Sequence, residues 1–143
     1  MEDFKLSRCF SILHRRSQQF IVAECSSLDL SYPECILLLA VFEEEARSQD
    51  ELAELLFLDK AVVTRTITML EQKNFITRRH DNKDRRIKRI FLTEEARRHE
   101  KFLRDVFHKW IYYLFMGIED TDSKTVENGI FALSDRAKSC TIR

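Results

Sequence analysis

The sequence predicts a mainly α-helical fold with one small two-stranded β-ribbon. Only 2 Gly and 1 Pro punctuate the 143 residues, which favours long helices and short connections over a β-rich design with many turns. Apolar residues recur at intervals of three and four over most of the chain, as the buried face of a helix requires. This pattern changes to partial alternation only in two short runs, 75–80 and 87–92, on either side of a charged turn.

The composition favours a single domain over residues 1–143. With 44% hydrophobic residues, the chain can bury a core of its own or complete one between subunits. No opening stretch has the order of a signal peptide, and no apolar run approaches the ~18 residues that a membrane span needs. We therefore expect a cytoplasmic protein without a membrane segment. The four cysteines are widely spaced and do not predict a disulfide framework.

Two helices are predicted in the first 43 residues. The first, from about residue 4 to 24, has an apolar stripe of Leu6, Phe10, Leu13, Phe20 and Ile21. Ser31 and Glu34 then form a capping-box pattern, in which each side chain accepts a hydrogen bond from the other's backbone N–H, and Pro33 suits the first turn. The run 35–42 is apolar on nearly every face, which predicts a buried central helix.

Residues 48–73 predict two short helices joined by a tight turn. Ser48 and Glu51 repeat the capping-box pattern and open the first helix, and Asp59 can cap the second. The apolar positions of the second helix are expected to face inward: Val62, Val63, Ile67 and Leu70. The opposite face is polar and basic: Lys60, Thr64, Arg65 and Thr68. This order is typical of a helix-turn-helix, whose second helix enters the major groove of DNA.

A β-wing is predicted after the second short helix. Asn74 stands where that helix must end, and Asn tolerates the left-handed conformation of such a cap. The runs 75–80 and 87–92 then form the two strands, with one face on the domain and one in solvent, around the turn 81–85. The fold expected for residues 31–92 is therefore a winged helix-turn-helix.

Two more helices follow the wing. Thr93 can cap the first, whose apolar stripe is Leu103, Val106, Phe107, Trp110, Ile111, Leu114 and Phe115. Gly117 ends or bends it, and a last helix over 121–140 has the stripe Val126, Ile130, Leu133 and Ala137. The terminal helices hold more apolar surface than a small winged helix needs. We therefore expect residues 4–28 and 93–140 to form a homodimerisation region.

Positive charge is concentrated in the helix-turn-helix and the wing. Residues 58–92 contain ten basic and four acidic residues, a net charge of +6, in a chain that is neutral as a whole. Clustered Lys and Arg neutralise phosphates, which predicts binding to double-stranded DNA. A protein-interaction module with a merely solvated basic face is the alternative from another functional class.

The stretch 49–97 resembles the winged helix-turn-helix of the MarR family of transcriptional regulators. The resemblance is carried by Leu52-Ala53, Val63-Thr64-Arg65, Leu70-Glu71, the wing signature Asp84-Arg85-Arg86, and Leu92-Thr93. It implies a homodimeric regulator, expected to be a repressor, that binds pseudo-palindromic DNA and is released by a small phenolic or lipophilic effector. It also implies that Asp84 positions Arg86 for the minor groove.

Three groups of residues are expected to have functional roles. The expected DNA-binding residues are Ser48, Gln49, Lys60, Ala61, Thr64, Arg65, Thr68, Lys73, Arg78, Lys83, Asp84, Arg85, Arg86 and Lys88. Within this set Thr64, Arg65 and Thr68 are expected to read bases, and Lys60, Lys73 and Lys88 to anchor phosphates. His14, Arg16 and Tyr32 are the candidates for an effector pocket.

Cys9, together with Tyr32, resembles the thiol and tyrosine of peroxide-sensing members, so a thiol switch at Cys9 is an alternative to the effector. The other interpretation of Cys9 is a small hydrophobe that is buried on the dimer stripe of the first helix.

Three residues depart from the family pattern. Asn74 replaces the usual Gly, Phe57 stands in the turn where a small residue is common, and Ala61 takes a place often held by Ser or Thr. Ala61 offers at most a methyl contact to thymine, so an operator preference cannot be transferred from a relative.

No residue pattern predicts catalysis, a metal or a cofactor. The four histidines are scattered and none pairs with Cys or a carboxylate at a metal-ligand spacing. There is no Gly-rich phosphate loop and no nucleophile elbow. We therefore do not expect an enzyme.

Overall fold

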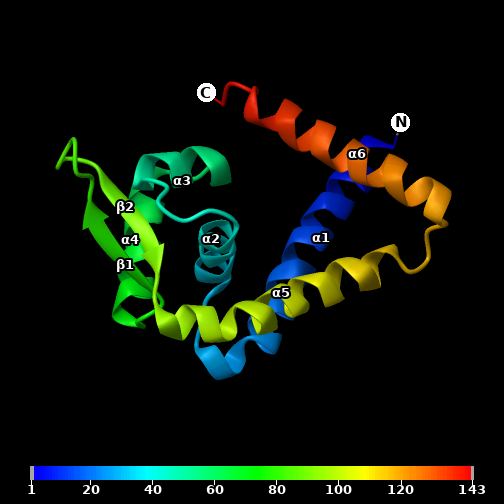
Figure 1. Cartoon of the computed structure of the whole chain (residues 1–143). Coiled ribbons are helices and arrows are strands. Elements are labelled where there is room, and N and C mark those ends of the chain that lie inside the picture. Colours follow the sequence, from blue (N-terminus) through cyan, green and yellow to red (C-terminus); the bar gives the residue numbers. More distant parts are fainter. Residues whose placement is uncertain (1, 143) are drawn as a thin grey trace. The chain divides into compact units, whose positions relative to one another are not determined.

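The computed structural model describes residues 2–142, and its elements follow the predicted order (Figure 1). The helices are α1 (Asp3–Glu24), η1 (Ser26–Leu28, a 3-10 helix), α2 (Tyr32–Glu43), α3 (Gln49–Leu56), α4 (Lys60–Gln72), α5 (Glu94–Phe115) and α6 (Asp120–Lys138). The strands are β1 (Ile76–His80) and β2 (Lys88–Leu92). The chain divides into two compact units, one ending at Trp110 and one beginning at Ile111, so α5 contributes to both.

Helix α2 is the centre of the first unit. It contacts α1, α3, α4 and β2. Its residues Leu37, Leu38 and Val41 are at most 1% exposed, as expected for a helix that is apolar on every face. The core continues on α3, α4, β2 and α5 with Leu52, Val63, Ile67, Leu70, Ile90 and Leu103. Val62, expected to face inward, is half-buried, and Thr66 lies in the core instead, its hydroxyl donating to the Val62 carbonyl at 2.8 Å.

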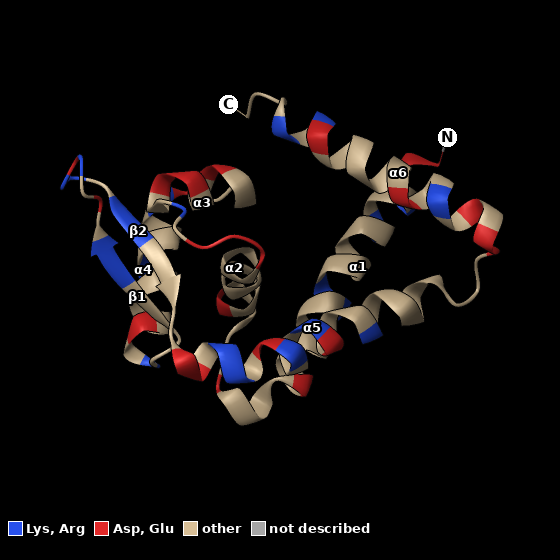
Figure 2. Ribbon diagram, viewed as in Figure 1, with Lys and Arg blue, Asp and Glu red and all other residues tan. Residues whose placement is uncertain are grey.

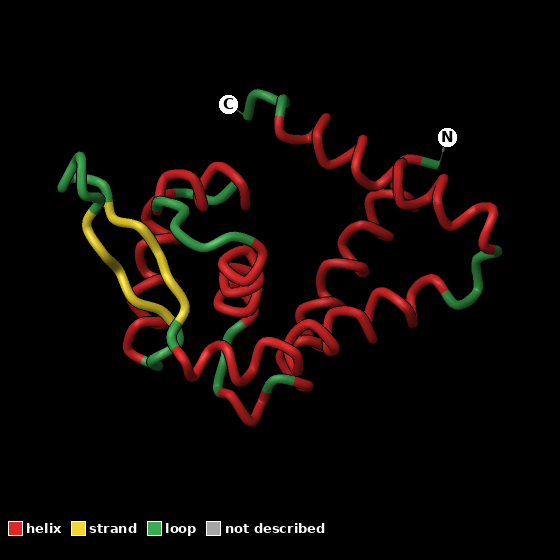
Figure 3. The backbone as a smooth tube through the Cα atoms, viewed as in Figure 1, coloured by secondary structure: helices red, strands yellow, loops and turns green. Residues whose placement is uncertain are grey.

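The two strands form an antiparallel ribbon with one buried face (Figure 3). Ile76 lies opposite Leu92, and both are buried together with Ile90. On the other face the Arg79 guanidinium lies 4.2 Å from the centre of the Phe91 ring. The predicted alternation of the wing, defined here as residues 76–92, is thus confirmed.

The predicted caps are confirmed in part. Ser48 and Glu51 make the full reciprocal capping box at the start of α3. The reciprocal box at Ser31 was a wrong prediction: the Ser31 hydroxyl accepts from the Glu34 N–H, but the Glu34 carboxylate turns away to Lys73. Asp59 occupies the N-cap position of α4 without a side-chain hydrogen bond.

Apolar side chains of the terminal helices are largely uncovered. On α1 only Ile21 is buried, while Leu6, Phe10 and Leu13 are 45–50% exposed. In the second unit α6 has no buried residue. No helix within residues 2–142 combines the length and the apolar character that crossing a bilayer requires.

Candidate nucleic-acid interface

The outer face of α4 presents four side chains at helical spacing. Ala61, Thr64 and Arg65 are exposed and Thr68 is half-buried. They occupy positions i, i+3, i+4 and i+7, which lie on one face of a helix. This face is held by Val63, Ile67 and Leu70 on the opposite side, which are fully or almost fully buried. The predicted base-reading residues therefore share one outward surface.

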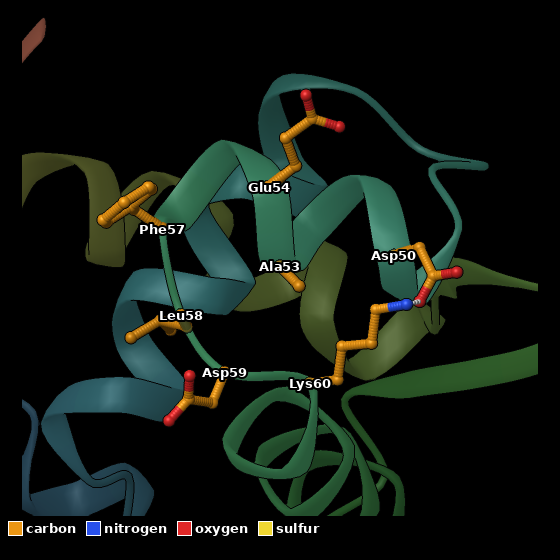
Figure 4. Close-up of a pocket in the computed structure, with 7 residues that line it drawn as sticks. All are labelled: Asp50, Ala53, Glu54, Phe57, Leu58, Asp59 and Lys60. Carbon is orange, nitrogen blue, oxygen red and sulfur yellow. Dashed lines mark ion pairs between the residues drawn. The ribbon is translucent and has the colours of Figure 1, made fainter. Parts of the chain in front are cut away.

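Two contacts connect this surface to α3. The Gln49 side-chain amide donates to the Thr64 hydroxyl at 3.3 Å. Lys60 lies 3.3 Å from the Asp50 carboxylate, and both side chains are more than 70% exposed, so this pair is weak. Figure 4 shows the Lys60 side chain extended toward Asp50, while the exposed Phe57 lies at the other end of the turn and points away from this pair. Ser48 is buried, because its hydroxyl caps α3.

The wing tip is organised by two carboxylates. Asp81 accepts the backbone N–H groups of Lys83 and Asp84, each at 3.0 Å, which fixes the turn. Asp84 accepts Nε of Arg86 on one oxygen and Nη2 on the other, both at 3.1 Å. The Arg86 side chain remains 91% exposed. The bond to Arg86 also lowers the pKa of Asp84 from its ordinary value.

Arg89 holds the wing to the rest of the unit, a role that no local sequence pattern indicates. Its Nε donates to the Asp81 carboxylate at 2.8 Å, and its Nη1 donates to the Ala46 carbonyl at 2.9 Å. The bond to Arg89 lowers the pKa of Asp81. From the sequence Arg89 is only one of the ten basic residues between 58 and 92, because its partner Ala46 lies 43 residues away.

Two basic residues predicted at the interface have structural partners instead. Lys73 Nζ donates to both oxygens of Glu34, at 2.8 and 3.1 Å, and to the Asp29 carbonyl. Arg78 forms a pair with Glu71 at 2.8 Å, which lowers the pKa of Glu71. Both cations are half-buried against a carboxylate that neutralises part of their charge, so they are weaker candidates for DNA contacts than the unpaired cations, and their role in binding stays a prediction.

The remaining cations point their charge to solvent. Within residues 2–142 no hydrogen bond or ion pair engages the charged groups of Arg65, Lys83, Arg85 and Lys88. With Arg86 they run from α4 to the wing tip, and Figure 2 shows basic segments along β1, β2 and the tip, whereas α3 is acidic. The combination of a protruding basic ribbon and a polar helix face can follow a duplex through two of its grooves.

The residues expected to bind an effector are only partly together. The rings of His14 and Tyr32 meet edge to face at 6.1 Å, and burial raises the pKa of the Tyr32 phenol. Arg16 instead donates to Gln19 at 2.7 Å on its own helix. Cys9 is exposed in the single chain, so its burial on a dimer interface stays a prediction, and within residues 2–142 its thiol makes no hydrogen bond to Tyr32. Across residues 2–142 no three His, Cys, Asp or Glu side chains are grouped as metal ligands.

The chain is similar to known proteins in both sequence and structure. A model of the MarR family matches residues 30–88. The HTH-type transcriptional regulator SarZ of Staphylococcus aureus is 32% identical over 101 residues, 68% of either chain. The HTH-type transcriptional regulator TtmR of Methylorubrum extorquens is 38% identical over 69 residues, which are 48% of this chain and 35% of that protein. The chain spans 54% and 47% of two further curated relatives.

Solved structures extend the similarity to almost the whole chain. A MarR transcriptional regulator from Methanosarcina mazei Go1 superposes with a TM-score of 0.88 at 24% identity, covering 95% of this chain and 97% of that one. A MarR mutant from E. coli, complexed with operator DNA, gives a TM-score of 0.81 at 17% identity, with 92% and 95% covered. At these identities the two structures establish the fold, which is the predicted winged helix-turn-helix.

Proposed function

Because the chain belongs to the MarR family, we propose that it is a transcriptional regulator that binds double-stranded operator DNA as a homodimer. Its named relatives are transcriptional regulators, and the chain is of this kind rather than an enzyme. In this proposal α4 enters the major groove and the wing tip follows the minor groove of each half-site, with half-sites about one helical turn apart.

The observation that carries the proposal is Arg86 at the wing tip. Its guanidinium is 91% exposed, yet two hydrogen bonds to Asp84 fix its direction. An arginine held in place on a thin ribbon is suited to the narrow, negative minor groove, because little side-chain entropy is lost on binding. The free charges of Lys83, Arg85 and Lys88 lie on the wing and would contact the flanking backbone, while Arg65 on α4 would face the bases.

The homodimer and the effector are the finer parts of the proposal. The uncovered apolar side chains of α1 and α6 favour dimerisation, since a monomer seldom exposes so many.

A small phenolic or lipophilic ligand near His14 and Tyr32 would release the repressor if its affinity differs between dimer geometries. The exposed thiol of Cys9 keeps oxidation as an alternative trigger. Release by mild peroxide in wild type but not in Cys9→Ser would favour oxidation over the ligand.

A salt series tests DNA binding itself. Duplexes selected from a randomised pool are titrated with the protein by fluorescence anisotropy at several KCl concentrations. We expect log affinity to fall steeply and linearly with log salt, because each neutralised phosphate contributes a slope of about −0.9. A flat line would contradict the proposal and favour a winged helix that serves as a protein-interaction module.

A further inference from the structure

The outer face of α4 offers methyl groups and one guanidinium rather than free hydroxyls. We propose that α4 reads the operator through the C5 methyl groups of thymines next to a guanine, with Ala61, Thr64 and Thr68 contacting the methyls and Arg65 the guanine. This inference rests on the proposed function, and it names the base chemistry that the helix recognises.

The Thr64 hydroxyl is occupied inside the protein. It donates its proton to the Lys60 carbonyl at 2.9 Å, and it accepts the Gln49 amide at 3.3 Å. A hydroxyl has one proton to donate and two lone pairs, so Thr64 has no donor left for a base and a single acceptor position. Its methyl group is the part of the side chain without a partner in the protein.

Thr68 and Ala61 complete an apolar face. The Thr68 hydroxyl donates to the Thr64 carbonyl at 2.9 Å, so it cannot donate to a base without breaking that bond. Ala61, one turn before Thr64, has only a methyl group. From Ala61 to Thr68 the three side chains therefore present methyls along the length of helix that would lie in the groove.

Arg65 is the polar exception on this face. Its guanidinium is exposed and, within residues 2–142, has no hydrogen-bond or ion-pair partner. In the major groove the thymine C5 methyl is the apolar group of the base edges, whereas guanine O6 and N7 suit a bidentate arginine. The pairing of three methyls with one free arginine thus matches thymine and guanine, and neither threonine hydroxyl has a proton left for adenine N7 or thymine O4.

Replacing thymine by uracil tests the inference, because uracil lacks only the C5 methyl group. A duplex selected by the wild-type protein is compared with the same duplex carrying deoxyuridine at the thymines of its half-sites. We expect affinity to fall about fourfold for each contacted methyl, the effect of burying one such group. Uracil in the flanking sequence should leave affinity unchanged.

Two variants of Thr64 assign the effect to the methyl group. Thr64→Val keeps a methyl and lacks the hydroxyl, so it should retain the preference for thymine over uracil. Thr64→Ser keeps the hydroxyl and lacks the methyl, so its preference should shrink by about fourfold. Since Thr64 is exposed, both variants should fold.

The failure of this inference can be distinguished from the failure of the proposed function. Equal affinity of the wild type for the two duplexes, at a steep salt dependence, overturns this inference and leaves DNA binding intact. A preference kept by Thr64→Ser and lost by Thr64→Val also overturns it, since the hydroxyl would then be the reading group. If no duplex is enriched by the wild type, the proposed function fails and the inference fails with it.

Discussion

Asp84 holds Arg86 with three hydrogen bonds, one to its backbone N–H and two to its guanidinium, each of 3.1 Å. These bonds favour the ionised carboxylate, so the pKa of Asp84 is lowered from its ordinary value. A group with a depressed pKa contributes stability above its ordinary pKa and loses it as pH falls through the lowered value. The pair therefore persists throughout the neutral range, and any pH dependence of DNA binding between pH 6 and 8 must come from other groups, in the range where histidines titrate.

Arg86 can be tested by separating its charge from its shape. Arg86→Ala should weaken binding and flatten the salt slope by about one unit, because one phosphate-neutralising charge is lost. Arg86→Lys keeps the charge but not the planar fork that Asp84 holds, so the slope should remain while affinity falls. Both slopes are measured by anisotropy in a KCl series.

The matched control is Arg98→Ala, an exposed arginine on α5 whose ion-pair partner within residues 2–142 is Glu95, one turn away. It should leave both affinity and slope as in wild type. If Arg86→Ala had the wild-type slope as well, the placement of the wing in a groove would be wrong.

At the scale of elements, Lys73 and Glu34 join the end of α4 to the start of α2. Glu34 is 5% exposed, and its carboxylate has the Lys73 ammonium at 2.8 Å. Removing one partner of a buried pair leaves the other charge without compensation. The pair thus links the end of α4 to α2, and it engages the charge of Lys73, the residue predicted to anchor a phosphate.

Two lysine variants separate these roles. Lys73→Met should lower the free energy of unfolding by about 2 kcal/mol. This loss is smaller than that expected on breaking a fully buried pair, because the lysine is half-buried. The salt slope of DNA binding should remain unchanged. Lys60→Met should change stability by less than about 0.5 kcal/mol, since its pair with Asp50 is exposed, and should flatten the slope by about one unit. Urea denaturation and the KCl series measure the two quantities. The opposite pattern would restore Lys73 as a phosphate contact.

Elements were predictable from the sequence where their signals are local. Helical periodicity and the Ser48–Glu51 box placed α3, and Asn74, with a φ of 64°, ends α4 in the left-handed conformation that Asn tolerates. The failures involve partners distant in sequence. Glu34 has the pattern of a capping residue, but Lys73, 39 residues later, takes its carboxylate. The hydrogen bond from Arg89 to the Ala46 carbonyl likewise could not be predicted from a local pattern.

The candidate site was predictable as a region and less so as a set of partners. Charge counting located the exposed cations Arg65, Arg85 and Lys88, because Arg65 lies opposite the apolar stripe of α4, Arg85 lies in the turn and Lys88 begins β2 next to that turn. It could not distinguish them from Arg78, which has the same charge and lies against Glu71. The hydroxyl bonds of Thr64 also depend on a rotamer and on Gln49, neither of which a sequence pattern specifies.

At the scale of the whole molecule, α6 allows a test of the proposed dimer. Ile130 and Leu133 are 51% and 56% exposed on one face of this helix. Replacing both with Glu should give a monomer in sedimentation velocity, because buried unpaired charges oppose association. Operator affinity should fall by about a hundredfold or more, since the two half-sites would no longer be bound by linked subunits.

Asn128→Glu is the control, because it adds a charge to the exposed opposite side of α6. This variant should remain dimeric and bind DNA as the wild type does. A dimer that survived both glutamates would place the subunit contact elsewhere.

The hydrogen bonds between the wing and the loop before α3 determine how the protein would dissociate from the proposed operator. Ala46 N–H donates to the Ile90 carbonyl at 2.9 Å, Ile90 N–H donates to the Arg47 carbonyl at 3.0 Å, and Leu92 N–H donates to the Glu45 carboxylate at 2.8 Å. Together with the bond from Arg89 to Ala46, these bonds fix the base of the ribbon to the loop before α3. Within residues 2–142 the tip of the ribbon has no such bonds to this loop and can bend independently. Because α4 contacts both α3 and β1, a displacement of α4 should carry the ribbon with it, and contacts in both grooves of a half-site would then be lost in one kinetic step. Dissociation should then follow a single exponential, without a partly bound species held by the wing alone.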